Sequence, residues 1–146
     1  MEGTVIRRLG PEHIMDVHAL WKEAGLTFHP EGRDSVGHIT KELEKGSLVI
    51  AGAFLGEALL AVALMTDDGR KGWINRLAVR PAYRGKGIAR QLIRFCETIL
   101  KGRGFGMSCC LIEDWNEASL ALFQSEGYEL RKDIFYLRKA LNGDDW

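Results

Sequence analysis

The sequence predicts a single α/β domain in which about four helices flank a mixed, mostly antiparallel sheet. Short apolar and β-branched runs alternate with amphipathic helical segments, and glycines end most of these segments. No linker, repeat or low-complexity tract interrupts residues 1–146. Hydrophobic residues make up 46% of the chain and charged residues 27%, which is typical of a globular domain with one core.

The first half of the chain is expected to place two helices between strands. The expected elements, in chain order, are a strand at 4–9, a helix at 11–24, a weaker helix from 34 or 35 to 45, strands at 47–54, 58–66 and 73–79, a helix at 87–101, a strand at 107–112, a helix from 116 to 127 and a strand at 129–138. Pro11 suits the first turn of a helix that Gly25 ends. Asp34 or Ser35 can cap the second helix, and Gly46 ends it.

Turns and periodicity predict the second half. Tight turns at 55–57 and 67–72 join the three middle strands into an antiparallel meander. The following helix repeats apolar residues such as Ile88 and Leu92 at helical spacing. Asn116 can cap the last helix, and residues 142–146 are expected to form a frayed tail.

Charge and cysteine usage argue against several classes of protein. The 20 basic and 20 acidic residues balance, so no overall field favours nucleic acid or a membrane surface. The longest apolar run, residues 58–65, is far shorter than a membrane span, and the N-terminus has no apolar run of signal-peptide length. The three cysteines show neither a disulfide framework nor metal-binding spacing. We therefore expect a cytoplasmic protein without a metal.

The turn at residues 84–89, Arg-Gly-Lys-Gly-Ile-Ala, combines clustered cations with glycines at the start of a helix. The segment from Arg80 to Arg94 contains five basic residues and no acidic residue. Cations are unfavourable at a helix N-terminus, and an anion bound there would resolve the conflict. Gly85 and Gly87 let the backbone approach such a ligand. A solvated basic loop is the alternative, because short glycine patterns have low specificity.

Residues 77–89, Leu-Ala-Val-Arg-Pro-Ala-Tyr-Arg-Gly-Lys-Gly-Ile-Ala, resemble the acetyl-CoA motif of the GNAT family of N-acetyltransferases. The family pattern Arg/Gln-x-x-Gly-x-Gly/Ala is matched by Arg84, Gly87 and Ala89. Residues 116–128 resemble the family's last-helix pattern, Asn-x-x-Ala-x-x-x-Tyr-x-x-x-Gly-Phe. The expected element order also resembles that fold over nearly the whole chain. The P-loop and dinucleotide-binding patterns are missing.

The resemblance implies an enzyme that transfers acetyl from acetyl-CoA to a primary amine of a small molecule or peptide by direct attack. Amides of the turn would hold the pyrophosphate, the edge at 77–79 would pair with pantetheine, and the Leu77 amide would stabilise the oxyanion. Asn116 and Ser119 would face the pantetheine arm, with Phe123 near the thiol, although an ordinary helix cap explains Asn116 equally well. The residues that the resemblance assigns to donor binding are Leu77, Ala78, Val79, Arg84, Gly85, Lys86, Gly87, Ile88, Ala89, Arg90, Asn116, Ser119 and Phe123.

Two positions depart from the family pattern and leave the proton transfers open. Phe123 stands where many relatives have a tyrosine that reprotonates the thiolate, although a thiolate can also leave unaided. Asn75 stands where many relatives have a glutamate base. Glu113 and His29 are the remaining candidates for the base, and each is explained as well by a solvated surface position. The catalytic candidates are therefore Glu113, Asn75 and His29.

Competing classes of function follow from these departures. The chain is either an enzyme or a catalytically degenerate acyl-CoA-binding sensor or interaction module. A nucleic-acid binder that uses the basic patch fits poorly with the balanced charge, and a ping-pong reaction through Cys109 or Cys110 is a remote alternative to buried strand cysteines. Family habit favours a homodimer. Acidic residues could attract a cationic acceptor; they are Glu31, Asp34, Glu113 and Asp114.

Overall fold

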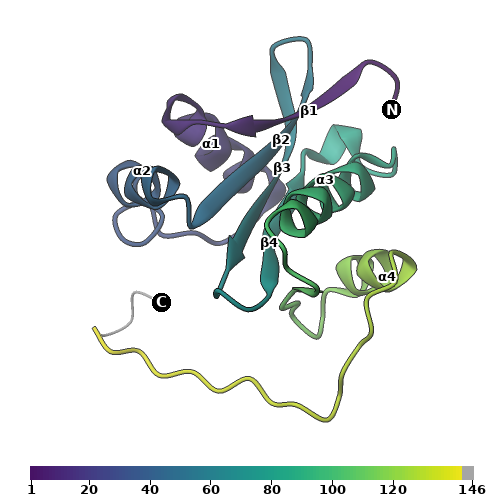
Figure 1. Ribbon diagram of the computed structural model, residues 1–146. Coiled ribbons are helices and arrows are strands. Elements are labelled where there is room, and N and C mark those ends of the chain that lie inside the picture. Colours follow the sequence, from purple (N-terminus) through teal and green to yellow (C-terminus); the bar gives the residue numbers. More distant parts are fainter. Residues whose placement is uncertain (143–146) are drawn as a thin grey trace. The chain divides into compact units, whose positions relative to one another are not determined.

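The computed structural model describes residues 1–142 as two compact units, which divide between Cys110 and Leu111 (Figure 1). The larger unit contains β1 (Thr4–Leu9), the short 3-10 helix η1 (Pro11–His13), α1 (Ile14–Ala24), α2 (Val36–Lys45), β2 (Leu48–Leu55), β3 (Ala58–Asp67), β4 (Gly72–Val79), the 3-10 helix η2 (Pro81–Tyr83), α3 (Ile88–Gly102) and β5 (Ser108–Cys109). The smaller unit contains α4 (Glu117–Ser125).

The expected elements appear in the expected order as far as α4, and local signals set their ends. Gly25 and Gly46 end α1 and α2 with left-handed φ angles of 80° and 77°. Ser35 caps α2, because its hydroxyl accepts a hydrogen bond of 3.1 Å from the His38 amide. Asp34, the other candidate cap, has a different role that is described below.

Two strand predictions need correction. The strand expected at 129–138 is wrong, because no strand follows α4 in the part of the chain that the structure describes. The strand expected at 107–112 is reduced to β5, which pairs with Gly72 and Trp73 alone. Both errors have one physical reason: residues with high strand propensity become a strand only where another backbone supplies the ladder bonds. The predicted tail lies, from residue 143 onward, outside the described residues.

The five strands form one sheet in the order β1-β2-β3-β4-β5. The first four strands are antiparallel to their neighbours, and β5 joins β4 in parallel. The sheet is therefore mixed and mostly antiparallel, as the sequence predicts. β4 lies next to the short last strand, and this position makes its outer edge important for the site.

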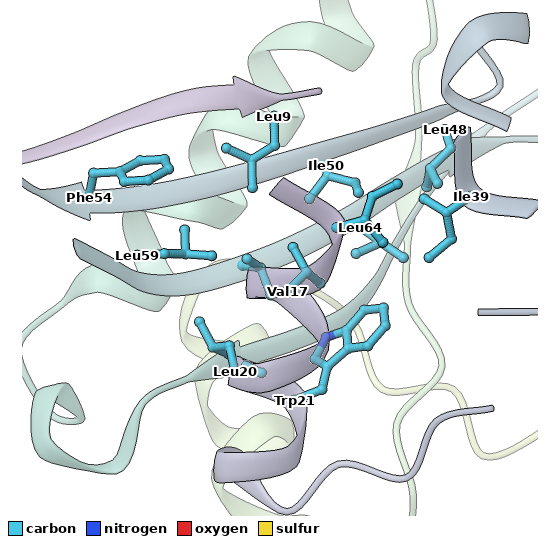
Figure 2. Packing of buried hydrophobic residues seen from close by; sticks show 13 residues of the cluster. Leu9, Val17, Leu20, Trp21, Ile39, Leu48, Ile50, Phe54, Leu59 and Leu64 are labelled. Atoms are coloured by element: carbon cyan, nitrogen blue, oxygen red, sulfur yellow. The ribbon is translucent and has the colours of Figure 1, made fainter. Parts of the chain in front are cut away.

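Helices cover both faces of this sheet in the larger unit (Figure 1). On one face, Val17, Leu20 and Trp21 of α1 pack against β-strand residues such as Ile50 and Leu64 (Figure 2). On the other face, α3 contacts β1 to β4. The backbone of Gly72 lies so close to α3 that a Cβ there would come within 2.3 Å of a Leu100 methyl group. The apolar stripe predicted for α3 is confirmed by its buried residues, which are Ile88, Leu92, Ile93, Cys96 and Leu100.

Candidate functional site

The middle of β4 contains a β-bulge. Val62 pairs with Ala78 and Leu64 pairs with Asn75, so that two steps along β3 match three steps along β4. Arg76, inside this interval, has a φ of 50° and is the one non-glycine residue with positive φ among residues 1–142. A left-handed conformation costs a non-glycine residue roughly 1–2 kcal/mol. The bulge therefore bends the strand at the expense of local strain.

Beyond the bulge, the outer edge of β4 has no strand partner among the described strands. β5 pairs only with Gly72 and Trp73, at the start of β4. On the inner edge, pairing with β3 resumes, and the Arg80 amide donates to the Leu60 carbonyl at 2.8 Å. The outer edge at Leu77–Val79 can thus accept an extended, amide-containing ligand as a further strand.

The turn that follows β4 presents backbone amides beside open space. The first α-helical bond of α3 runs from the Gln91 amide to the Gly87 carbonyl at 3.2 Å, so the amides of residues 88–90 have no intrahelical acceptor. Gly87, the N-cap, makes no side-chain cap hydrogen bond. Gly85 and Gly87 have φ angles of 75° and 80°, and a Cβ at either position would meet no atom within 4 Å. Such a helix start is suited to a phosphate group.

At least two of the five clustered cations, Arg80 and Arg84, are engaged within the protein. Arg80 forms an ion pair with Glu23 of α1, and its Nε donates to the Leu59 carbonyl at 2.7 Å. Arg84 donates to the carbonyls of Val79 at 3.3 Å and Ala24 at 3.5 Å. The charge of this basic run is therefore partly compensated at Arg80, because α1 brings a carboxylate from 57 positions away. Lys86, by contrast, is an exposed side chain of the turn itself.

The loop between α1 and α2 is organised around Asp34. Asp34 is 5% exposed and is the one buried charged residue within residues 1–142. Its Oδ2 accepts hydrogen bonds from the His29 amide at 2.8 Å and from the Arg76 guanidinium at 3.2 Å. The His18 ring nitrogen Nε2 lies 2.6 Å from the Asp34 carbonyl oxygen. The bond to Asp34 fixes the backbone of His29, one of the candidates for the base. The His29 side chain is half-buried.

The predicted catalytic residues are divided between the two units. His29 and Asn75 both belong to the larger unit, and Asn75 is a half-buried residue of β4 paired with Leu64. Glu113 belongs to the smaller unit, where its side chain is exposed and its carbonyl accepts a bond of 3.0 Å from the Asn116 amide. A shared role for these residues stays a prediction.

The smaller unit carries the last-helix motif. The Asn116 side chain caps α4, because its Oδ1 accepts a bond of 3.2 Å from the Ser119 amide. This confirms the capping interpretation of Asn116, while contacts of Asn116 and Ser119 with a ligand stay predictions. Phe123 is 4% exposed, and its ring meets Tyr128 edge to face with centroids 5.0 Å apart. A phenol therefore lies beside the position at which the family tyrosine is missing.

The sequence does not predict the contacts that Asp34 and Arg76 make in the larger unit, or the contact that Tyr128 makes in the smaller one. Asp34 is expected there only as a helix cap or a charge for the acceptor, Arg76 carries no local signal, and Tyr128 is only part of a motif. Of these contacts, only the one between Tyr128 and Phe123 has a signal in the sequence, which is the short spacing of the two residues across the end of α4. The chain turns at the end of α4, and the Tyr128 amide bonds the Phe123 carbonyl at 3.0 Å. The Asp34–Arg76 contact spans 42 positions, which no sequence pattern reveals.

The cysteines have the character of structural residues. Burial raises the pKa of the Cys96 thiol to about 12 and that of Cys110 to about 11. These thiols are therefore almost wholly protonated at neutral pH and are poor nucleophiles. In the described chain, no three His, Cys, Asp or Glu side chains are grouped as metal ligands. Between residues 1 and 142, no helix is both long enough and apolar enough to span a membrane.

The acetyltransferase (GNAT) family is matched over residues 14–128 of this chain. The chain therefore belongs to the GNAT family, a class of enzymes that use acetyl-CoA as acyl donor, and the resemblance seen in the sequence is confirmed. The mixed α/β architecture agrees with that assignment.

Individual relatives support the family without identifying this protein. Acetyltransferase SG1711 of Sodalis glossinidius (strain morsitans) is 34% identical over 77 residues, and this match spans 53% of the chain and 54% of the relative, about half of each. The PaiA N-acetyltransferase of Thermoplasma acidophilum, solved in complex with coenzyme A, gives a TM-score of 0.79 at 18% identity, over 90% of this chain and 92% of that one. AAC(6')-Iy, solved with the bisubstrate analogue CoA-S-monomethyl-acetylneamine, gives a TM-score of 0.80 at 19% identity, over 94% of this chain and 98% of that one. The two solved structures share the fold.

Proposed function

We propose that the chain is a single N-acetyltransferase domain that transfers acetyl from acetyl-CoA to a primary amine of a small molecule or peptide. One observation carries the proposal: the amide-presenting turn at 84–89 directly follows the unpartnered outer edge of β4. Coenzyme A offers a pyrophosphate for the first feature and an amide-containing arm for the second. The two features fit the two ends of one ligand.

Each donor-binding residue has a defined role in this proposal. The amides of residues 84–89 hold the pyrophosphate, and Lys86 and Arg90 balance its charge. The edge at Leu77–Val79 pairs with the pantetheine arm, and the Leu77 amide donates to the thioester oxygen as it gains charge. For Asn116, Ser119 and Phe123, contact with the pantetheine arm stays what the sequence resemblance implies.

The reaction requires an attack and two proton movements. The neutral amine nitrogen attacks the thioester carbon, and the tetrahedral intermediate then expels the CoA thiolate as the carbon–sulfur bond breaks. The proton lost by the nitrogen passes to a base, for which His29 or Glu113 is the candidate, in either case directly or through water. Asn75 cannot accept that proton and instead orients the amine or the water. The thiolate takes up a proton, for which the Tyr128 phenol beside Phe123 is the candidate donor.

An acceptor screen tests the proposal. Release of the CoA thiol from acetyl-CoA should be followed with a panel comprising neamine, a short aliphatic diamine and a peptide with a free N-terminus and a lysine. Neamine is included because a fold relative is known with an acetylneamine conjugate. Calorimetry with coenzyme A should accompany the screen. A chain that does not bind coenzyme A would refute the donor-site assignment, whereas turnover of any panel amine supports the proposed reaction.

A non-catalytic acyl-CoA-binding module is the second candidate, and the missing acid–base groups at Phe123 and Asn75 favour it. It predicts coenzyme A binding with no turnover of any amine. It also predicts that Glu113→Gln and His29→Ala leave the behaviour of the protein unchanged. A cytoplasmic location and a homodimer stay predictions of the sequence, and light scattering tests the latter.

A further inference from the structure

Arg76 adopts a backbone conformation that disfavours any residue with a side chain. Its φ of 50° lies in the left-handed region, where the Cβ crowds the backbone. Conformations of this kind persist only where the surroundings enforce them, and they concentrate at functional positions. Arg76 directly precedes Leu77–Val79, the edge to which the proposed function assigns the acyl arm. The contacts that enforce its conformation therefore matter for that edge.

The Arg76 side chain is held on three sides. Its Nη1 donates to the Thr27 carbonyl at 3.2 Å, and its Nη2 donates to Asp34 Oδ2 at 3.2 Å. Its Cζ lies 4.9 Å from the ring centroid of Trp21, which is wholly buried in the core. Only 18% of the side chain is exposed. The planar guanidinium is thus fixed against α1 and the following loop at once.

Asp34 extends the same connection into the loop at 25–35. The Asp34 Oδ2 that receives Arg76 also receives the His29 amide at 2.8 Å, and Arg33 Nε lies 3.6 Å away. One carboxylate oxygen therefore joins the loop that carries His29 to the bulge of β4. A buried ion pair is weak evidence for stability, because apolar residues of similar volume often stabilise as well. Its directional bonds instead select one geometry.

We propose that Arg76 and Asp34 are a positioning pair that fixes the β4 bulge relative to the loop at 25–35. This inference rests on the proposed function: the bulge would align the thioester carbonyl at Leu77, and the loop would align the acceptor side near His29. Neither residue donates or accepts a proton in the reaction. The pair acts by fixing the distance between the thioester carbonyl and the acceptor amine. A displacement of about 1 Å between reacting groups can lower a rate on the order of a hundredfold.

Four variants separate positioning from simple support of the fold. Arg76→Met removes both hydrogen bonds, and Arg76→Lys keeps the charge without the planar fork. Arg76→Gly relieves the strain of the positive φ but also lacks the side-chain hydrogen bonds to Thr27 and Asp34. Asp34→Asn keeps the shape of the acidic partner and removes its charge. Arg103→Met is the matched control, because Arg103 pairs with Asp67 at 3.4 Å and is also partly buried, but lies outside the proposed site.

The kinetic readout uses acetyl-CoA with the panel amine that reacts fastest. We expect kcat to fall about tenfold to a hundredfold in Arg76→Met, Arg76→Gly and Asp34→Asn. The KM for acetyl-CoA and the Kd for coenzyme A should stay within about threefold, because the phosphate turn is untouched. Arg76→Lys should recover part of the loss, and Arg103→Met should match the wild-type protein. Arg76→Gly should be more stable than Arg76→Met and no more active; wild-type kcat in the glycine variant would overturn the inference.

Hydrogen exchange keeps this test separate from the test of the proposed function. In Arg76→Met and Asp34→Asn, the amides of residues 25–35 should exchange at least about tenfold faster than in the wild-type protein. Exchange in Arg103→Met should be unchanged there. Unchanged exchange in the Arg76 and Asp34 variants overturns the positioning pair whether or not the chain is an active enzyme. Failure of the wild-type chain to bind coenzyme A would instead overturn the proposed function.

Discussion

A tryptophan at Gly87 should abolish the binding of coenzyme A while the protein stays folded. Gly87 is the N-cap of α3, with a φ of 80°, and a Cβ there would meet no protein atom within 4 Å. A Cβ at this position therefore points into open space, and we expect the attached indole to enter the space assigned to the pyrophosphate. It would block the approach of a phosphate to the amides of residues 88–90.

The expected magnitude follows from the bonds that are lost. A hydrogen bond to a charged group contributes about 1.5–3 kcal/mol, so the loss of two amide–phosphate bonds would weaken binding by about 3–6 kcal/mol. Because each 1.4 kcal/mol is about tenfold in Kd, the affinity should fall at least about a hundredfold. The cost to the fold is the left-handed backbone alone, roughly 1–2 kcal/mol. A protein with a typical stability of about 5–15 kcal/mol tolerates that loss.

Gly46 provides a matched control for this backbone cost. It has a φ of 77°, ends α2, and a Cβ added there would likewise meet no atom within 4 Å. Gly46→Trp should therefore lose about the same unfolding free energy as Gly87→Trp, again roughly 1–2 kcal/mol. Urea unfolding measures that quantity, and titration calorimetry with coenzyme A measures the affinity. Equal affinity in the two variants would refute the assignment of the turn to phosphate binding.

Three further predictions concern proton transfer, the thiols and one surface carboxylate. Tyr128→Phe should lower kcat by at least about a hundredfold if the phenol protonates the thiolate, with partial recovery on adding Phe123→Tyr; an unchanged rate removes Tyr128 from the reaction. Cys110→Ala should keep turnover within about twofold, because burial raises the pKa of the Cys110 thiol to about 11; an acetylated cysteine found by mass spectrometry would contradict direct attack. Hydrogen bonds from the backbone amides of Lys71 and Arg70 and from the Trp73 indole lower the pKa of Asp68 from 3.8 to about 2. The stabilisation from Asp68 is complete above pH 3.8 and is lost as the pH falls through about 2, so the stability difference from Asp68→Asn, measured by urea unfolding, should shrink over that interval. A difference that stays constant there would show that the carboxylate keeps its ordinary pKa.

The parts of the fold that the sequence predicts well are those with local causes. Gly25, Ser35 and Gly87 mark helix ends through their own backbone angles or side chains, so each boundary depends on a few adjacent residues. The turn at 84–89 is visible in the sequence for the same reason, because its glycines and amides are contiguous, and phosphate binding there stays a prediction. The strand expected at 129–138 fails because a strand depends on a partner elsewhere in the chain.

The contacts of Arg80 and Arg76 cannot be predicted from the sequence, because they join distant segments. Glu23 meets Arg80 from 57 positions away, and Asp34 meets Arg76 from 42. In both cases the residue types are common surface residues, and only the fold places them together. The charge count along residues 80–94 therefore overstates the field available to an anion, and a longer-range role for Asp34 replaces the expected helix cap.

The engagement of Asp34 also narrows how the protein could select its acceptor. Asp34 is only 5% exposed, and its Oδ2 already accepts hydrogen bonds from His29 and Arg76 beside Arg33, so its carboxylate is poorly accessible to a cationic amine. An ammonium group that bound to Oδ2 would compete with the Arg76 guanidinium. If the proposed acceptor is recognised by its charge, we expect other carboxylates to do so, of which Glu31 belongs to the same loop as His29. The amine reacts in its neutral form, so the reacting nitrogen needs no carboxylate beside it. The engagement of Asp34 with His29 and Arg76 is consistent with that chemistry.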